Sequence, residues 1–440
     1  MKLFGTDGIR GPVGSAILSP DLLLKVAYAA KKIIAPNGGK VIIGKDTRVS
    51  GYVYESLLEA GFLTAGMDVY LTGPLTTPAL SYYTHHYNFD IGCMISASHN
   101  SYHDNGIKFF DRNGDKLDSI IEGKIEGAAE EVFKPLTADQ IGKAKRLPLG
   151  INNYLTFCVS KFNKNFLDGF KVVFDASNGG GFKLGPRILS ELGADVLPLG
   201  SSPNGYNIND RCGSTDTQLV SKLIQTADYD IGISIDGDGD RVILIDELGN
   251  TVDGDQIIFI LAKHLKIKKC LDGPVAITVH SNQGLRQALE SLNIDTIITN
   301  IGDKYVTSAL KKAGGHLGGE ASGHIINTKY NNTGDGILAA LQVLEVMKDT
   351  GKKLNELLNE YSPVPSINSN YKLAADSPVL YSDLEKFSKK WSLELGKMGR
   401  VLARKSGTEP LLRLLIESSE PELFEDIEND FKKKFKSFLR

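Results

Sequence analysis

The chain has 440 residues, of which 41% are hydrophobic, and this length suggests roughly three or four domains. Its formal net charge of −3 and its pI near 6.3 argue against a protein that binds nucleic acid or a membrane surface through its overall field, but they leave room for a locally basic pocket. The four cysteines have no CxxC spacing, and MKLFGTDGIRG at the amino terminus lacks the apolar stretch of a signal peptide, so we expect a cytoplasmic protein with reduced thiols.

A strand, helix, strand pattern recurs three times along the chain. Apolar strands at 41–46, 172–179 and 275–282 each precede a helical pattern and a second strand, at 67–71, 194–199 and 294–298. A third strand then ends in an unusual loop, with the sequences DIGCMISASHN (90–100), DIGISIDGDGDR (230–241) and GGHLGGEASGH (314–324). Such repeats predict mainly parallel sheets buried between helices. Ligands bind beyond the carboxyl ends of strands in these sheets, so we expect the three loops to share one cleft.

The sequence pattern changes after the Pro-bearing stretch 361–365, where the strand, helix, strand repeat ends. A strand pair around ARKSGTEPLLRLLIE (403–417) precedes an amphipathic helix, and the apolar face of this helix, which is typical of core packing, holds Phe424, Ile427, Phe431, Phe435 and Phe438. The predicted fold class is α/β, with three similar α/β domains of mixed, mainly parallel sheets and a C-terminal α+β domain around a central cleft. The predicted domain bounds are 1–150, 151–250, 251–365 and 366–440.

The first unusual loop holds a candidate nucleophile, Ser98. Strand alternation predicts that Ser96 continues the strand, whereas Ser98 lies beside His99 in the exit loop. No GxSxG elbow surrounds it, so the pattern of a serine hydrolase does not fit. Ser98 taken alone is also compatible with a capping hydroxyl. Lys108, ten residues further on, can transfer a proton or stabilise charge.

The second loop, DGDGDR, is a candidate metal site. Asp236, Asp238 and Asp240 alternate with glycines that let the backbone curl, so three carboxylates can converge on one hard cation, for which Mg²⁺ is the natural candidate beside phosphate. A calcium EF-hand loop does not fit, because Arg241 takes the place of the turn glycine and strands flank the loop.

The third loop and the C-terminal strand pair are candidate sites for a sugar phosphate. Glu320 and Ser322 can hold sugar hydroxyls and His324 can donate to an anion, although Gly-rich turns with a carboxylate are common. The C-terminal strand pair offers hydroxyls, backbone N–H groups and guanidinium groups, which can together form a phosphate site. The residues are Arg404, Ser406, Gly407, Thr408 and Arg413. An ordinary hairpin turn is the alternative interpretation. A serine facing a metal loop and a phosphate loop indicates phosphoryl transfer through a phosphoserine.

Five ordered motifs give the whole chain a family resemblance: FGTDGIRG, ISASHN followed by DNGIKFF, DGDGDR, GEASGH and RKSGTEP. In order and spacing they resemble the α-D-phosphohexomutases. Within that superfamily, PNGYNINDRCGST (203–215) and DNGIKFF resemble the branch that acts on glucosamine phosphates more than the phosphomannomutase or phosphoglucomutase branches. The chain departs from the family pattern at Ser101, Lys304, Ala321 and Lys405, and the last three of these bear on substrate selectivity.

The resemblance implies a role for each matching position. Ser98 would carry the phosphate that completes the Mg²⁺ site of Asp236, Asp238 and Asp240. Side chains that stabilise charge or move protons at the reacting hydroxyl would be Arg10, Lys108, Arg241 and His324. Side chains that bind the sugar would be Glu320, Ser322 and Lys304. The non-reacting phosphate would be held by Arg404, Ser406, Gly407, Thr408 and Arg413.

The same resemblance implies an isomerase that interconverts glucosamine 6-phosphate and glucosamine 1-phosphate through a glucosamine 1,6-bisphosphate, for UDP-N-acetylglucosamine and cell-wall precursor synthesis. Phosphomannomutase or phosphoglucomutase activity, a phosphatase, and a non-catalytic protein that binds a sugar phosphate or a cation remain as alternatives. The expected partner is a small sugar phosphate, with no nucleic acid and no membrane. A homodimer is left open.

Overall fold

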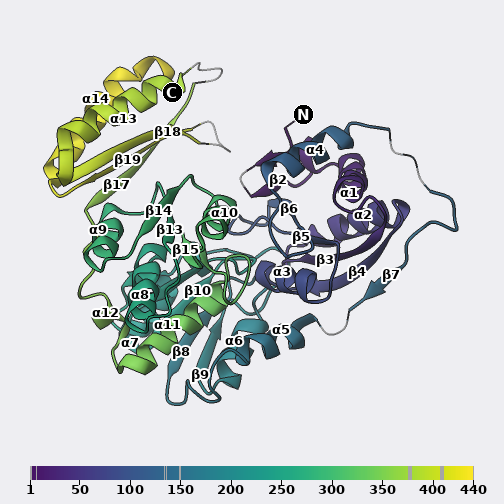
Figure 1. Ribbon diagram of the computed structural model, residues 1–440, viewed down its shortest axis with the longest axis horizontal. Helices are drawn as coiled ribbons and strands as arrows, with labels where there is room; N and C mark the ends of the chain where they lie inside the picture. The colour runs from purple at the N-terminus through teal and green to yellow at the C-terminus, as the bar shows by residue number, and fades with distance from the viewer. Residues whose placement is uncertain are drawn as a thin grey trace. The chain divides into compact units, whose positions relative to one another are not determined.

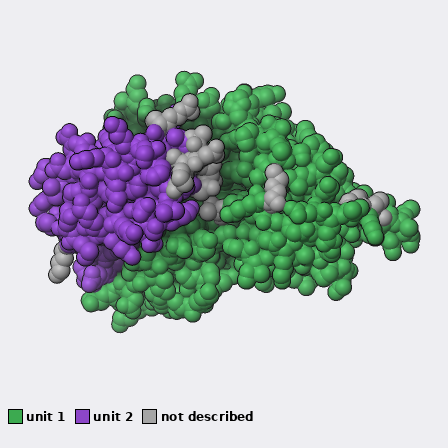
Figure 2. Space-filling model, turned by 90° about the horizontal axis from the view of Figure 1, so that it is seen from above, with its two compact units in different colours: residues 1–280, 292–359 green, residues 281–291, 360–440 purple. Residues whose placement is uncertain are grey.

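The structure is a computed structural model that describes residues 2–5, 7–132, 134, 136–147, 150–374, 379–406 and 411–439. Two compact units make up the chain: unit 1 contains Met1–His280 and Leu292–Asn359, and unit 2 contains Ser281–Ser291 and Glu360–Arg440 (Figure 2). Within the described part of the chain, no helix has both the length and the hydropathy needed to span a bilayer.

The first sheet of unit 1 has seven strands in the order β1-β2-β6-β5-β3-β4-β7. Strands β5, β3, β4 and β7 run parallel, and β6 closes antiparallel onto β5. Helices α1, α2 and α4 pack together with this sheet in one hydrophobic core (Figure 1). The elements are β1 (Phe4–Gly5), β2 (Gly8–Pro12), α1 (Pro20–Ile34), β3 (Gly39–Lys45), α2 (Gly51–Thr64), β4 (Met67–Pro74), α3 (Thr77–His86), β5 (Ile91–Ile95), β6 (Asp104–Phe110), α4 (Ser119–Ala129) and β7 (Ala144–Arg146).

The second and third sheets of unit 1 are smaller, with the strand orders β12-β11-β10-β8-β9 and β14-β13-β15-β16. Around the second sheet lie α5 (Gly150–Val159), β8 (Lys171–Asp175), α6 (Leu184–Glu191), β9 (Asp195–Leu199), α7 (Gln218–Thr226), β10 (Ile231–Ile235), β11 (Val242–Ile245) and β12 (Thr251–Val252). Around the third lie α8 (Gly254–Ile267), β13 (Val275–Thr278), β14 (Thr296–Thr299), α10 (Asp303–Ala313), β15 (Leu317–Gly319), β16 (Ile325–Asn327), α11 (Gly336–Thr350) and α12 (Leu354–Leu357).

One strand order is common to the three sheets. The orders β4-β3-β5-β6, β9-β8-β10-β11 and β14-β13-β15-β16 each place the first strand of a repeat between the second and the third, all parallel, and add a fourth strand antiparallel to the third. The predicted repeat is therefore present, and each unusual loop is the turn between its third and fourth strands. We call each sheet with its helices a lobe, numbered first to third in chain order.

Unit 2 is an α+β structure built on the antiparallel sheet β17-β19-β18. Its elements are α9 (Gln283–Ser291), β17 (Ser366–Lys372), α13 (Tyr381–Leu395), β18 (Gly399–Lys405), β19 (Leu411–Ser418) and α14 (Phe424–Lys434). Ile427, Phe431 and Phe435 are buried in its core, and Phe424 and Phe438 pack against that core, as the amphipathic pattern predicts. The predicted fold class is confirmed, and the four domain bounds remain predictions.

Candidate active site

Ser98 lies in the turn between β5 and β6, fully buried. Its hydroxyl donates to Asp236 Oδ2 at 2.5 Å, and His99 Nδ1 is 3.2 Å away. β5 ends at Ile95, so the expectation that Ser96 continues the strand is wrong by one residue. Ser96 instead braces the turn: its Oγ donates to Asp46 Oδ2 at 2.7 Å and accepts from the Ser98 amide at 2.9 Å.

Asp236, Asp238 and Asp240 form the turn between β10 and β11, and all three are buried. One carboxylate oxygen from each lies within 4.8 Å of the others. Gly239 has φ +71°, which lets the backbone curl, and a Cβ at Gly237 would lie 2.7 Å from the Ser98 carbonyl oxygen. The two glycines therefore permit both the turn and its close approach to the serine loop.

The carboxylates of this turn have the properties of ligands for a divalent cation. Burial, together with the charges of Asp240 and Asp238, raises the pKa of Asp236 well above its ordinary value. Buried oxygens Oδ1 of Asp238 and Asp240 have no hydrogen-bond partner among the described residues. A hard cation such as Mg²⁺ would satisfy these oxygens and remove the repulsion that raises the pKa, so the residues fit such an ion.

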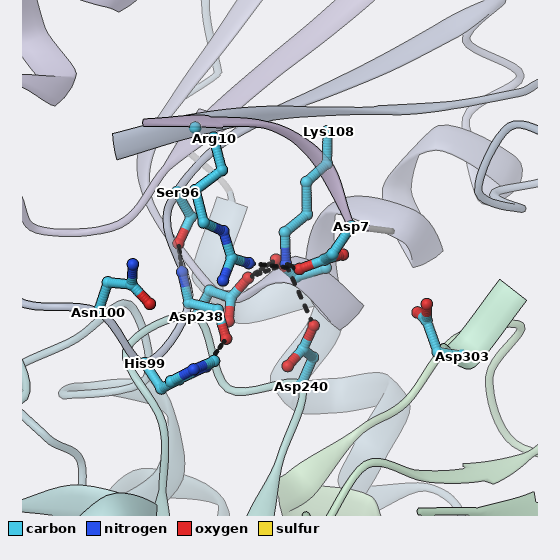
Figure 3. A network of polar contacts seen from close by, with 12 residues as sticks. Asp7, Arg10, Ser96, His99, Asn100, Lys108, Asp238, Asp240 and Asp303 are labelled. Carbon is cyan, nitrogen blue, oxygen red and sulfur yellow. Dashed lines mark hydrogen bonds and ion pairs between the residues drawn. The ribbon is translucent and has the colours of Figure 1, made fainter. Parts of the chain in front are cut away.

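Lys108, on β6, is buried among carboxylates from two lobes (Figure 3). Its Nζ lies 2.8 Å from Asp238 Oδ2, 2.9 Å from Asp7 Oδ2 and 3.3 Å from Asp240 Oδ2. Burial by itself would lower the pKa of this amine, but the attraction of the three carboxylates outweighs it, so the pKa lies well above the ordinary value. In this arrangement Lys108 is therefore protonated and lies beside the loop that carries Ser98.

Two arginines extend this basic region. Arg10, on β2, donates to Asp7 Oδ2 at 2.6 Å. The Arg241 side chain is 23% exposed, and its Nε lies 3.9 Å from Asp240 Oδ1.

His99, next to Ser98, has a lowered pKa of about 4. Burial is the main cause, and the charges of Arg241 and Arg10 add to it, so the imidazole is neutral at pH 7.

His324 lies in the third lobe, between two carboxylates. Its Nδ1 is 3.6 Å from Asp240 Oδ1 and its Nε2 is 3.3 Å from Asp303 Oδ2. Burial opposes protonation of the ring, but the two carboxylates dominate and raise the pKa to about 10. Asp303 also pairs with Lys116, whose Nζ is 2.7 Å from Asp7 Oδ1. The chain of charges thus links the three lobes.

Asp7, Lys116 and Asp303 are missing from the residues that the sequence predicts. Asp7 is in FGTDGIRG, whose motif signal could have identified it. Lys116, between Asp115 and Leu117, and Asp303, between Gly302 and Lys304, lie outside the five motifs, and only the packing of the lobes brings them together.

The predicted sugar-binding residues all lie in unit 1, but the contacts of Glu320 and Lys304 are with different partners. Glu320 follows β15 and accepts from the Gly302 amide at 2.9 Å, and Ser322 is exposed. Lys304, at the start of α10, pairs with Glu122 of the first lobe at 2.9 Å. In this conformation Lys304 therefore holds two lobes together.

The predicted phosphate-binding residues lie in unit 2. Arg404 on β18 faces Arg413 on β19, and the Ser406 amide donates to the Leu411 carbonyl at 2.9 Å. Burial, followed by the charge of Arg413, lowers the pKa of Arg404, so an anion there would relieve the repulsion. Gly407 and Thr408 lie outside the described residues.

Comparison with known families accounts for nearly the whole chain. Models of the phosphoglucomutase/phosphomannomutase alpha/beta/alpha domains I, II and III match residues 1–135, 152–249 and 253–364. The model of the phosphoglucomutase/phosphomannomutase C-terminal domain matches residues 366–434.

Individual relatives agree with these models. A protein named phosphoglucosamine mutase, from Hamiltonella defensa, is 45% identical over 96% of this chain and 95% of its own length. A Burkholderia thailandensis phosphoglucomutase/phosphomannomutase family protein has a similar structure, with a TM-score of 0.82 at 22% identity over 99% of this chain and 97% of that one. Aspergillus fumigatus N-acetylphosphoglucosamine mutase, solved with GlcNAc-6P and magnesium, gives a TM-score of 0.67 at 18% identity, covering 97% of this chain and 93% of that one. The protein therefore belongs to the phosphoglucomutase/phosphomannomutase family, the α-D-phosphohexomutases that its five motifs resemble.

Proposed function

We propose that the protein is a phosphoglucosamine mutase that interconverts glucosamine 6-phosphate and glucosamine 1-phosphate. The observation that carries this proposal is the hydroxyl of Ser98, 2.5 Å from one carboxylate of a buried three-aspartate turn, with the Lys108 ammonium pairing with another. The identity of 45% to a phosphoglucosamine mutase supports the choice of substrate. A passive binding protein would not need a reactive hydroxyl at this position.

The proposed reaction moves one phosphoryl group twice. A hydroxyl oxygen of the sugar phosphate bonds to the phosphorus on phospho-Ser98, the bond from phosphorus to Ser98 Oγ breaks, and the proton of the sugar hydroxyl ends on Ser98 Oγ. The product is glucosamine 1,6-bisphosphate. This intermediate then reverses its orientation in the site. The reverse reaction returns its other phosphate to Ser98, so the net change is isomerisation.

Charged side chains of the site have roles in this transfer. Lys108, cationic and buried, is our candidate for moving the proton and for stabilising charge on the transferring group, and Arg10, Arg241 and His324 add positive charge around it. Mg²⁺, held by Asp236, Asp238, Asp240 and the phosphate of Ser98, would neutralise charge on that group.

We also propose that Arg404, Ser406, Gly407, Thr408 and Arg413 hold the non-reacting phosphate and that Glu320, Ser322 and Lys304 contact the sugar. Lys304 would have to leave Glu122 to do so. A cytoplasmic location fits the proposed place in UDP-N-acetylglucosamine supply.

Replacing the nucleophile tests the chemistry. Ser98→Ala should abolish turnover while the protein stays folded, and intact-mass measurement should find one added phosphate on the parent, and none on the variant, after incubation with glucosamine 1,6-bisphosphate. Ser101→Ala, an exposed serine of the same turn, is the matched control and should keep its activity. Ser98→Ala activity within a few-fold of the parent would rule the mechanism out.

Two product measurements separate the alternatives. Isomer formation without release of inorganic phosphate is expected of a mutase, whereas a phosphatase would release phosphate in step with substrate loss. Values of kcat/KM for glucosamine, glucose and mannose 6-phosphates report discrimination in the transition state. A glucose or mannose substrate that is better by more than about tenfold, or about 1.4 kcal/mol, would keep the enzyme class and reject glucosamine phosphate as the substrate.

A further inference from the structure

The segment PNGYNINDRCGST (203–215) links β9 to α7 in the second lobe and contacts the first lobe. The Gly205 carbonyl accepts from the Val49 backbone N–H at 3.0 Å. Within the second lobe, the backbone N–H of Asn209 donates to the Ser177 carbonyl at 2.9 Å. Asn209 Nδ2 then donates to two backbone carbonyls of the serine turn, Ser98 O and Asn100 O, each at 2.9 Å. The side-chain amide of Asn209, from the second lobe, thus binds the backbone of the turn that contains the candidate nucleophile.

The same two carbonyls are held from the first lobe by Arg48. Its guanidinium is fully buried and donates to Ser98 O at 2.9 Å and Asn100 O at 2.7 Å. It also donates to Ser101 O and, at 3.1 Å, to Asp104 O. The serine turn is therefore held between a cation of its own lobe and an amide of the next.

The backbone conformation of the turn requires such support. Ser98 has φ +51°, a left-handed conformation that serine rarely adopts and that persists only where the surroundings enforce it. Asn209 has φ +56°, which asparagine tolerates better than most residues. Both residues of the contact thus have a positive φ.

We propose that Asn209 is a positioning residue: it fixes the Ser98 turn from the second lobe, so that the nucleophile is aligned with the carboxylates of the β10–β11 turn. This role rests on the proposed function, because it matters only if Ser98 carries the phosphoryl group. The aspartate turn and Asn209 belong to the same lobe, so this lobe carries both the candidate metal ligands and the residue that holds the Ser98 turn.

Two substitutions remove the amide donor without forcing the backbone. Asn209→Gly keeps a residue that tolerates positive φ, and Asn209→Asp keeps the size and shape of the side chain. We expect both to lower kcat by about tenfold to a hundredfold, with KM within about twofold, because misplacement of a reacting group acts on the transition state. Amide hydrogen exchange in peptides covering residues 96–104 should become faster in both variants. The midpoint of thermal unfolding should stay close to that of the parent in Asn209→Gly and fall in Asn209→Asp, whose carboxylate would face two backbone carbonyl oxygens.

A matched control is Asn332→Ala. Asn332 Nδ2 also donates to a backbone carbonyl of the first lobe, Asn113 O at 2.7 Å, but in a different turn from Ser98's. This variant should keep the parent kcat and the parent exchange rate in residues 96–104.

The outcomes distinguish this inference from the proposed function. Parent-like kcat and parent-like exchange in both Asn209 variants would overturn the positioning role while Ser98 chemistry stands. Loss of kcat in Asn209→Gly but not in Asn209→Asp would also overturn it, because the donor would then be irrelevant. Full activity of Ser98→Ala would overturn the proposed function itself.

Discussion

Lys116 shows, at the scale of single residues, how the buried charges of the site depend on one another. Its Nζ contacts Asp7 of the first lobe and Asp303 of the third. Burial lowers the pKa of Lys116, but the two carboxylates raise it by more, so the net shift is upward. Lys116 is therefore a cation at any physiological pH. Asp303 then orients His324. Removing the lysine would leave two carboxylates without their shared partner.

Lys116→Met should destabilise the protein by about 1 to 3 kcal/mol, because Asp7 and Asp303 lose a buried ammonium and keep only their other cationic partners. Lys311→Met, which removes the ammonium of the partly exposed pair Lys311–Asp115, should cost at most about 1 kcal/mol. Thermal unfolding of the two variants beside the parent measures the difference. Equal midpoints for the two variants would contradict the assigned importance of the buried network.

The predicted and the missed residues differ in the kind of information that identifies them. Ser98, Asp236, Asp238 and Asp240 could be found because each follows an apolar strand in a turn of unusual composition. Lys116 could not, because its partner Asp7 is 109 residues away and no local pattern joins them. Long-range pairing depends on how the lobes pack, which periodicity does not encode.

At the scale of elements, the start of α11 joins two lobes through one carboxylate. Asp335 caps the helix by accepting from the Leu338 amide at 3.0 Å. Its second oxygen accepts from the Tyr154 hydroxyl on α5 and from Asn331 Nδ2 at 3.1 Å. The cap therefore also satisfies two buried donors.

Asp335→Ala should lower the free energy of unfolding by about 2 to 4 kcal/mol, from the lost cap and from two buried donors left without an acceptor. Asp335→Asn, which retains an oxygen for the cap, should lose less. Midpoints of thermal unfolding for both variants check the order. A smaller loss for alanine than for asparagine would show that the contacts of this carboxylate do not stabilise the fold.

The elements themselves were largely predictable, since strands such as β3, β8 and β13 are continuous apolar runs between helical patterns. The strand β7, with three exposed residues, has no such signature, so the sequence pattern does not predict it. Alternation alone predicts that Ser96 continues the strand, but β5 ends at Ile95, and the Ser96 hydroxyl donates to Asp46 instead.

At the scale of the whole molecule, a cation held by the three aspartates would add stability only when the lobes are folded, because these carboxylates are buried between the serine turn and the third lobe. A ligand that binds the folded state alone stabilises it by mass action. Binding of a divalent cation at this turn would therefore raise the stability of the fold.

Adding Mg²⁺ to chelator-treated protein should raise the midpoint of unfolding, with about 2.7 kcal/mol gained at a concentration about 100 times the dissociation constant. The increase should disappear in Asp238→Asn and persist in Asp210→Asn, an exposed acid of the second lobe. Thermal unfolding at several Mg²⁺ concentrations measures it. The same increase in Asp238→Asn would place the ion elsewhere.

The buried Lys108 has a consequence for synthesis on the ribosome. Asp238, its carboxylate partner in the second lobe, follows it by 130 residues, a stretch that takes roughly 6 to 26 s to translate at about 5 to 20 residues per second. During that interval the nascent first lobe has only Asp7 of the three carboxylates that surround the ammonium in the finished protein. Emergence of the second lobe then supplies the missing countercharges, which favours docking of the two lobes before the third has been made.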